Sequence, residues 1–376
     1  MLDVHQIYIL DKEGFAMALI VCPECGGKLS DKAEYCPHCG CPSKFIPQSI
    51  LDDFIVDDTG CLKKYNGSER IVEIPEGITS IGDGAFLGSD VISVTIPNGV
   101  TRIGAVSFCE CENLVSISIP DSVTHIGHGA FCSCKSLESI ILPCGISAIE
   151  AQTFDGCESL NSIVIPDSVE TIGYRAFIRC CNLEDITLPY GLNEIAPYTF
   201  EGCKSLSEIV LPESISVICE CAFECCKSLT RISIPKTVTV IGLHAFSRCE
   251  SLQAITIPEE LVILGEFAFA YCKSLTEIAI PHNVTRIREH TFADCENLEN
   301  IIIPNGVQSI EEGAFRDCAC LTEITLPQSI TFVHEEAFEI GWDEYVLETV
   351  YFDNAIQKKR LEDSFGGYDV ELLIKK

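Results

Sequence analysis

The stretch that decides the fold is CENLVSISIPDSVTHIGHGAFCSC, residues 111–134. Its I-x-I step has a period of two, which predicts a short strand with one buried face and one wet face. Pro120 ends this strand because proline has no N–H group to donate. The V-x-x-I step that follows has a turn-like spacing. The A-F-x-x-C segment predicts a single helical or 3₁₀ turn that returns the chain.

The same pattern recurs along most of the chain. Twelve prolines are spaced by 22 residues at the first step and by 23 at every later step, and each is followed eleven positions later by phenylalanine. The prolines stand at positions 75, 97, 120, 143, 166, 189, 212, 235, 258, 281, 304 and 327. One such repeat cannot bury its own apolar face, so neighbouring repeats must stack, and the stack becomes the core. The sequence therefore predicts a solenoid over residues 71–338.

A column of cysteines shares this frame. Cysteine stands three residues after phenylalanine in ten repeats, at positions 111, 134, 157, 180, 203, 226, 249, 272, 295 and 318. One residue per turn at one stacked position forms a line, so we expect buried structural thiols there and no tetrahedral metal site. Other cysteines lie outside this column, at positions 109, 132, 219, 221 and 225. We expect surface or half-buried thiols there, with a redox pair or an adventitious metal site as the alternative.

The repeat resembles the BspA-type leucine-rich repeat of bacterial and some protozoan proteins. Residues 54–67, FIVDDTGCLKKYNG, resemble the hairpin-like cap that precedes such repeats, so the resemblance covers about residues 54–338. It implies a curved α/β leucine-rich-repeat solenoid, with short parallel strands and helical or 3₁₀ turns, that binds other proteins. A column of glycines, among them Gly82, Gly104 and Gly127, is shared with Glu150 and Arg288, so it should not require a positive φ.

Four other cysteines form the strongest chemical motif. Cys22-Pro-Glu-Cys25 and Cys36-Pro-His-Cys39 are two C-x-x-C pairs, each followed by glycine. This spacing places four thiolates around one tetrahedral, structural Zn²⁺, and the segment resembles the small zinc ribbons of bacterial proteins. Metal binding would supply the folding energy of so short a segment. His38 lies inside the second pair, but four sulfurs already complete the ligand shell.

These patterns divide the chain into six segments. Met17 opens an apolar run before the first cysteine, whereas residues 1–16 show no pattern, and one hypothesis is that translation begins at Met17 and that 1–16 are a non-native extension. The segments are 1–16, the zinc ribbon 17–42, a linker 43–53, an N-terminal cap 54–70, the repeats 71–338 and a C-terminal cap 339–376. Terminal repeats generally need such caps because the end of the stack is otherwise exposed.

The charge limits the partners. The 376 residues carry a formal net charge of −31, and residues 71–338 hold 13 basic and 36 acidic residues, a net charge of −23. Such a surface repels phosphate backbones and anionic lipid, so we expect neither a nucleic acid nor a membrane as partner. No apolar run of 18 residues predicts a transmembrane helix. The 24 cysteines in a chain without a visible secretory signal favour a reducing, cytoplasmic location.

No catalytic motif is present, so the chain is predicted not to be an enzyme. The favoured function is a protein-interaction scaffold that binds a partner with a basic surface. Its binding face would be the wet side of the strands, four and two residues before each proline: Ser93/Thr95, Ser116/Ser118, Asp185/Thr187, Glu208/Val210, Arg231/Ser233, Glu277/Ala279 and Glu323/Thr325. One alternative is a surface-exposed adhesin. Another is a nucleic-acid-associated regulator that uses the ribbon, although residues 17–42 hold only two basic residues.

Overall fold

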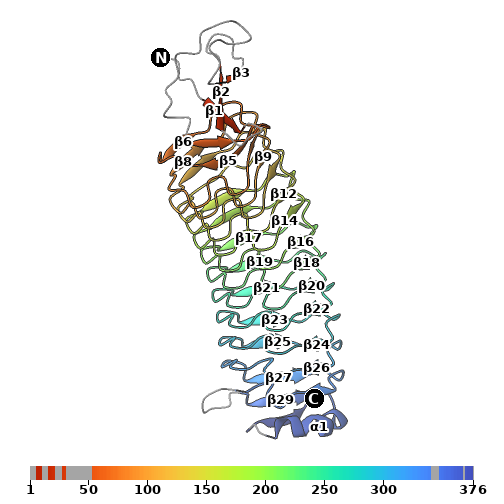
Figure 1. Cartoon of the computed structure of the whole chain (residues 1–376). Helices are drawn as coiled ribbons and strands as arrows, with labels where there is room; N and C mark the ends of the chain where they lie inside the picture. Colours follow the sequence, from red (N-terminus) through yellow and green to blue (C-terminus); the bar gives the residue numbers. More distant parts are fainter. Residues whose placement is uncertain are drawn as a thin grey trace. The chain divides into compact units, whose positions relative to one another are not determined.

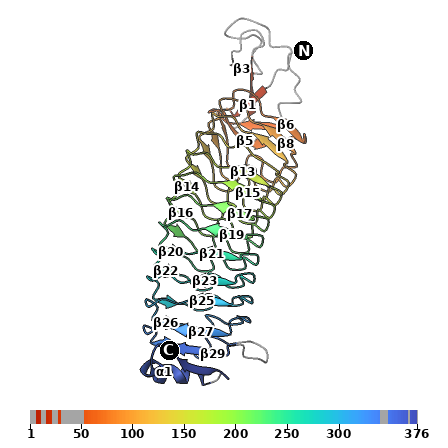
Figure 2. The ribbon, with the colours of Figure 1, turned by 180° about the vertical axis from the view of Figure 1, so that it is seen from behind.

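The computed structural model describes residues 53–339, 347–366 and 369–375, and the backbone of three strands at residues 6–10, 16–21 and 28–30. The chain divides into two compact parts, Met1–Val169 and Glu170–Lys376. Within each part the repeats stack as a solenoid of parallel strands, and two rows of strands are visible in Figure 1 and, from behind, in Figure 2.

The first row, row 1, consists of the predicted strands, which are present before eleven of the twelve repeat prolines. Before Pro143 the structure has only an isolated parallel bridge between Ser139 and Ser162. In these strands a buried aliphatic residue stands between two residues that face solvent. In the first part they are β6 (Ile71–Glu73), β8 (Ser93–Thr95), β10 (Ser116–Ser118) and β13 (Ser162–Val164). In the second part they are β15 (Asp185–Thr187), β17 (Glu208–Val210), β19 (Arg231–Ser233), β21 (Ala254–Thr256), β23 (Glu277–Ala279), β25 (Asn300–Ile302) and β27 (Glu323–Leu326).

A second row, row 2, stands where the sequence predicted only a turn. The second aliphatic residue of the V-x-x-I step ends a two-residue strand that pairs in parallel with its neighbours. In the first part these are β7 (Ser80–Ile81), β9 (Arg102–Ile103), β11 (His125–Ile126) and β12 (Ala148–Ile149). In the second part they are β14 (Thr171–Ile172), β16 (Glu194–Ile195), β18 (Val217–Ile218), β20 (Val240–Ile241), β22 (Ile263–Leu264), β24 (Arg286–Ile287), β26 (Ser309–Ile310) and β28 (Phe332–Val333).

The N-terminal strands extend row 2 of the first part. β4 (Phe54–Val56) and β5 (Cys61–Tyr65) form an antiparallel hairpin, and β5 pairs in parallel with β7. β1 (Gln6–Leu10) pairs in parallel with β4 and antiparallel with β2 (Ala16–Val21), which pairs with β3 (Lys28–Ser30). The hairpin thus offers the first repeat a strand to pair with, which leaves that edge covered.

The phenylalanine column fills the core between the two rows. Eleven of the twelve repeat phenylalanines are at most 1% exposed, and Phe338 is 5% exposed. Successive rings lie nearly parallel, for example Phe108 on Phe131 at 5.5 Å between centroids and Phe246 on Phe269 at 5.4 Å. Tyr65 continues the stack into the hairpin, 5.0 Å from Phe86. Each ring is therefore buried by its neighbours in the adjoining repeats, as the stacking argument required.

The return segments are turns, which corrects the expected helical or 3₁₀ turn. Residues 53–339 contain no helix. Alternate N–H groups donate to the next repeat, as from Gly129 to Ala151 O at 3.0 Å, while those between them close turns within the repeat, as from Ala130 to Gly127 O at 3.2 Å. Neighbouring repeats thus satisfy the backbone groups that a helix would satisfy internally. This requires left-handed residues two before and two after each phenylalanine, and sixteen of them are not glycine, with φ of 47–61°.

The cysteine column completes the core. Among the described residues, nine ladder cysteines donate their S–H group to the carbonyl of the phenylalanine one repeat earlier, for example Cys134 to Phe108 O at 3.1 Å and Cys249 to Phe223 O at 3.2 Å. Burial raises the pKa of the Cys111 thiol from 9.0 to about 12 and that of Cys249 well above 9.0. The expectation of buried structural thiols is therefore confirmed for the residues described.

The C-terminal segment adds to the last repeat. β29 (Thr349–Phe352) pairs in parallel with β27, and β30 (Glu371–Ile374) pairs with β29. The helix α1 (Ala355–Leu361) and the 3₁₀ helix η2 (Glu362–Phe365) follow β29, at the end of the second part in Figure 1. Gln357 is buried and donates to Pro327 O at 2.6 Å, and Phe365 lies 5.9 Å from Phe338. These contacts satisfy a backbone carbonyl and cover the last ring of the stack.

We predict that Glu110→Gly stabilises the protein. Glu110 is exposed with φ of 60°, and Gly88, Gly156 and Gly202 take the same position in other repeats. A left-handed non-glycine residue costs about 1–2 kcal/mol, partly offset by the extra freedom of glycine in the unfolded chain, so a gain of about 0.5–1 kcal/mol is expected. Urea unfolding of the full chain would measure it. Gly202→Ala is the reverse control, and its free energy of unfolding should fall by about 1 kcal/mol. Equal urea midpoints for both variants would contradict the prediction that a left-handed non-glycine residue is strained.

We also predict that the stability falls as pH rises above 9. A folded-state pKa raised by burial means that the unfolded thiols lose their protons first, so the stability present below pH 9 is lost as pH rises towards 12. At pH 10 the loss is about 1 kcal/mol for each buried ladder thiol. Urea midpoints between pH 7.5 and 10 would measure the slope, and Cys249→Ala should make it shallower. An unchanged slope in that variant would argue against the ladder as its source.

Candidate functional site

The strand positions predicted to be wet are indeed on the surface. In β10, β17, β19 and β23 both flanking residues are exposed and the central isoleucine is buried. Ser93 and Thr325 are half-buried, and the other twelve predicted positions are exposed. Most of the side chains are small, hydroxylated or acidic, as expected. The alternation that hides the core therefore also fixes which residues a partner of row 1 could touch.

Apolar side chains interrupt this polar face. Two residues before the proline, Ile141 is 85% exposed and Val164 is 67% exposed in the first part, and Val210 and Ile302 are 76% and 67% exposed in the second part. Of these, the predicted face included only Val210. Exposed β-branched residues are compatible with the strand, but each leaves apolar surface in water. The column two residues before proline, which holds Ser or Thr in most other repeats, thus holds an exposed apolar side chain in these four repeats.

One of these residues lines a hollow in the second part. The hollow measures about 710 Å³ and lies over β15 and β17, with Thr187, Leu188, Val210 and Leu211 among its lining residues. β17 is the edge strand of the five-stranded parallel sheet that runs through β19 and β21 to β25. A smaller hollow of about 290 Å³ continues it across β17 to β19 and shares Glu208, Val210 and Glu213 with it. Together they span three consecutive row 1 strands.

Tyr190 is the aromatic residue of this hollow. It is 82% exposed and follows Pro189 directly. Most repeats carry an acidic or amide residue there, such as Asp167, Glu213 and Glu259. The carbonyl of Tyr190 accepts a hydrogen bond from the Ser214 hydroxyl at 2.7 Å, which ties its backbone to the next repeat. Tyr190 lies outside the predicted face, which comprised only positions four and two residues before each proline, and the signal for it in the sequence is the break in the column after proline.

The hollow has an acidic border. Glu184, Asp185, Glu208 and Glu213 are all exposed and line it. None of these four carboxylates forms an ion pair within the described residues. Arg231 stands opposite Glu208 in the strand register and lines the smaller hollow, without an ion pair between the two side chains. An apolar floor with an aromatic residue and uncompensated negative charge around it suits a cationic, partly apolar ligand.

The predicted zinc ligands lie elsewhere in the chain. Cys22, Cys25, Cys36 and Cys39 are outside the described residues, as are His38 and Cys41. The four-cysteine site therefore stays a prediction from the sequence. Its neighbours β2 and β3 flank the first pair of cysteines and are paired with each other in antiparallel fashion.

Two cysteines outside the ladder, Cys109 and Cys219, lie in environments that disfavour the thiolate form. Cys109 and Cys132 are half-buried in adjacent repeats, and burial, followed by the charge of Cys132, raises the pKa of Cys109 to about 12. Burial and then the carboxylate of Glu194 raise the pKa of Cys219 to about 11. Because the thiolate is the reactive form, these environments disfavour thiol chemistry at neutral pH. The raised pKa values of Cys109 and Cys219 therefore do not favour the redox alternative for these residues.

Two histidines that share a column have a structural explanation. The ring of Phe267 lies between His244 and His290, 4.7 Å from each centroid. All three residues are left-handed turn residues in successive repeats. They stack as the phenylalanines do, but on the outer side of the turns. This arrangement gives both histidine rings a packing role.

Comparison with known protein families identifies the repeats. The model of the BspA type leucine rich repeat region matches residues 63–180, 124–249 and 217–341, which together span about three quarters of the chain. The chain belongs to the BspA-type leucine-rich-repeat family. The matched residues include both rows of strands from β6 to β28 and the turns that carry the phenylalanines. No curated protein matches the chain.

Solved structures of leucine-rich-repeat proteins share the fold. A protein from Bacteroides ovatus is 26% identical, with a TM-score of 0.64 over 84% of this chain and 94% of that chain. A leucine rich cell surface protein from Faecalibacterium prausnitzii is 27% identical, with a TM-score of 0.55 over 82% and 94%. The pneumococcal vaccine antigen PcpA is 18% identical, with a TM-score of 0.54 over 86% and 84%, a likeness of fold alone.

Leucine-rich-repeat proteins are in general protein-interaction scaffolds or surface proteins, and the family and its neighbours are typically not enzymes. In the described ranges, no helix combines the length and the apolar character needed to cross a bilayer.

Proposed function

We propose that this protein is a non-enzymatic scaffold that binds a protein partner through the hollow around Tyr190. The partner would present an apolar or aromatic side chain between lysine or arginine residues. The observation that carries the proposal is the combination of an exposed tyrosine and Val210 with four unpaired carboxylates on one strand face. This narrows the predicted acidic and hydroxylated face to β15, β17 and β19.

The apolar part of the hollow supports an anchoring contact. Tyrosine is enriched at interface hot spots because its rigid ring buries a large area at little cost in conformational entropy. Tyr190 is held by the hydrogen bond to its carbonyl and is otherwise open to solvent. A partner side chain that packs on Tyr190 and Val210 would cover apolar surface that the free protein leaves in water.

The acidic border supports a basic partner. The four carboxylates lie within a repeat region of net charge −23, so the local field adds to that of the surrounding surface. Such a field speeds the encounter with a cationic segment and repels acidic ones. The same field disfavours nucleic acid and anionic lipid as partners.

We further propose that the protein acts in the cytoplasm. Seventeen cysteines of the described residues are free thiols, among them the exposed Cys144 and Cys320, which suits a reducing compartment. The alternative is a surface protein, which is favoured by the name of the F. prausnitzii relative. In that case the same hollow would face an extracellular ligand.

A photo-crosslinking experiment tests the hollow. With p-benzoylphenylalanine at position 190 of the full chain, irradiation of the native cells should give adducts whose captured segment carries lysine or arginine beside an apolar residue. The double variant Glu208→Lys, Glu213→Lys should abolish them by charge repulsion. Tyr190→Ala should weaken the binding of the identified partner by about 30-fold, as expected for a hot spot of about 2 kcal/mol.

The matched control reverses two acidic residues on the same row outside the hollow, Glu277→Lys with Glu323→Lys, and should keep the adducts. A crosslinker at Ile302, which is similarly exposed, should not give them. Adducts that persist after reversal of the hollow's border, or a captured segment that is acidic, would overturn the proposal. External protease before irradiation distinguishes the two compartments, because it removes adducts of a surface protein only.

We also propose that Cys22, Cys25, Cys36 and Cys39 hold one structural Zn²⁺. Two C-x-x-C pairs at this spacing support it, and a four-sulfur shell would leave no open position for catalysis.

The full chain, purified under reducing conditions and dialysed against zinc-free buffer, should retain one zinc per chain by elemental analysis. Cys22→Ser with Cys36→Ser should lose it, because two of four ligands are gone. The exposed thiols offer a control, since Cys144→Ser with Cys320→Ser should retain the metal. Equal zinc contents in both double variants would exclude the ribbon as the binding site.

A further inference from the structure

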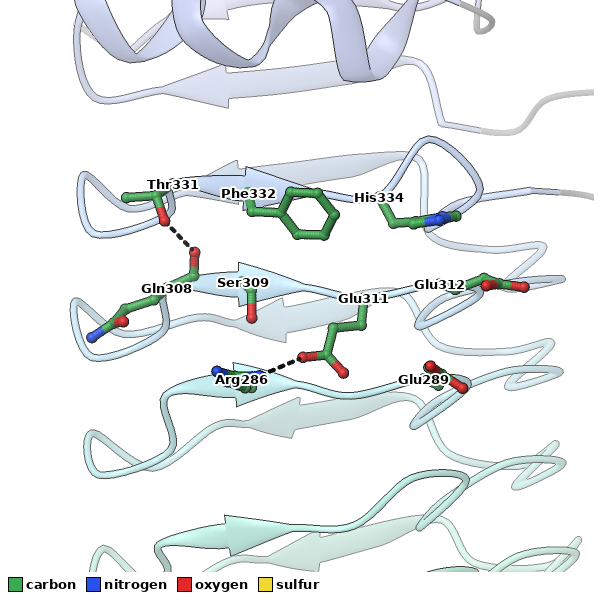
Figure 3. A pocket seen from close by; sticks show the side chains of 9 residues that line it. All are labelled: Arg286, Glu289, Gln308, Ser309, Glu311, Glu312, Thr331, Phe332 and His334. Carbon is green, nitrogen blue, oxygen red and sulfur yellow. Dashed lines mark hydrogen bonds and ion pairs between the residues drawn. The ribbon is translucent and has the colours of Figure 1, made fainter.

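A second hollow, on row 2 of the second part, lies beside a cluster of potential metal ligands. It measures about 600 Å³ and is lined by residues of the last three repeats. Figure 3 shows Glu289, Glu312 and His334 above one another on one side, where the chain leaves β24, β26 and β28. On the same face Arg286 forms an ion pair with Glu311, 3.6 Å between Nη1 and Oε1. The hollow is distinct from the one around Tyr190.

His334 occupies a column that six of the nine earliest repeats fill with glycine. At Gly265 a Cβ atom would lie 2.4 Å from the backbone of Gly242, so these repeats have no room for a side chain there. The last three repeats instead carry Arg288, Glu311 and His334 in the column. Long side chains that can bind a ligand are therefore concentrated at this end of row 2.

Three of the residues here bring their ligand atoms together. One nitrogen of His334 and one carboxylate oxygen each from Glu312 and Glu336 lie within 4.8 Å of one another. Nδ1 of His334 accepts a hydrogen bond from the Glu336 N–H group at 3.2 Å. In the neutral ring the proton then sits on Nε2, and the lone pair of Nδ1 points towards the backbone of Glu336. A metal ion bound at Nδ1 would keep this tautomer but would replace the hydrogen bond from the Glu336 N–H group.

The two carboxylates lack a counter-ion. Glu312 and Glu336 are both exposed, and neither takes part in an ion pair among the residues described. The nearby arginines are committed elsewhere: Arg286 to Glu311, Arg288 to Glu266 and Arg316 to Asp317 and Glu339. Two like charges at this separation repel each other, and a cation between them would remove that repulsion.

The donor set selects a class of metal. Oxygen ligands alone would suit Ca²⁺ or Mg²⁺, whereas an imidazole nitrogen favours Zn²⁺ and its first-row neighbours. Zinc bonds of about 2.0–2.2 Å place neighbouring ligand atoms about 3.4 Å apart, so the side chains would close by little more than 1 Å. Two exposed glutamates can make that adjustment by rotation. Three protein ligands would leave a coordination position open towards the hollow.

We propose that Glu312, His334 and Glu336 form a site for a divalent first-row transition-metal ion such as Zn²⁺. It is separate from the ribbon cysteines, and its ligands come from two consecutive repeats. Binding there would join the turns that follow β26 and β28.

Zinc titration of the full chain tests this site. The chain is first dialysed so that only tightly held zinc stays, and Zn²⁺ alone is then added in an isothermal titration calorimeter under reducing conditions. The wild-type chain should bind one equivalent more than His334→Asn. Glu312→Gln with Glu336→Gln should show the same loss, which guards against a local effect of either change.

The matched control is His282→Asn. His282 is also exposed and lies beside a glutamate, 3.0 Å between its Nδ1 and the Oε2 of Glu259, but it has no third ligand within reach among the described residues. This variant should bind zinc as the wild type does. Zinc held by thiols would be retained in all of these chains. An unchanged titration for His334→Asn would therefore overturn the proposal, whatever the outcome at Tyr190 or at the ribbon.

Discussion

The whole structure depends on the burial of one phenylalanine ring per repeat between the rings of the adjoining repeats. Within each part successive centroids lie 4.8–5.7 Å apart, and almost no ring surface reaches water. A ring at the end of such a stack would lose half of its contacts. Tyr65 at the hairpin and Phe365 after α1 provide them at the two ends. The nearly constant spacing of the repeats follows from this stacking, and the shorter first step of 22 residues still places Phe108 on Phe86 at 4.8 Å.

The second consequence concerns the backbone. The turn that carries the ring has no helical hydrogen bonds, so its N–H groups donate alternately to the next repeat and within the repeat. The ladder cysteines add a weak donor to each phenylalanine carbonyl one repeat earlier. This regularity is strong enough to hold sixteen non-glycine residues in the left-handed region. These left-handed residues are distributed evenly over the repeats. They are therefore a property of the repeat architecture and do not indicate one functional site.

Because the core uses fixed columns, the remaining columns are free to differ between repeats. Four of the five lysines in residues 71–338 stand in one column, and three of them pair with a glutamate of an adjacent repeat, as Lys273 does with Glu296 at 2.6 Å. Such exposed pairs each contribute at most about 1 kcal/mol. The two hollows lie where a repeat departs from the usual residue type of a column. Tyr190 follows Pro189 where most repeats have an acidic or amide residue, and His334 stands in a column where six repeats have glycine. Function is therefore to be sought in the exceptions to the repeat.

The sequence by itself determined the repeat frame, the buried columns, most of the strands before the prolines and the family. A position that is buried once in every repeat carries an apolar residue at the same interval in the sequence, so the pattern can be read directly. It did not determine the second row of strands, because two-residue strands are too short to show an alternation and are held by pairing between repeats. It also misjudged the return segments, whose hydrogen bonds to the next repeat reach residues 21 to 23 positions away. The hollow at Tyr190 and the cluster at His334 were decided by the tertiary structure alone. Stacking brings residues of consecutive repeats within contact distance, and only the register of that stack determines which side chains meet.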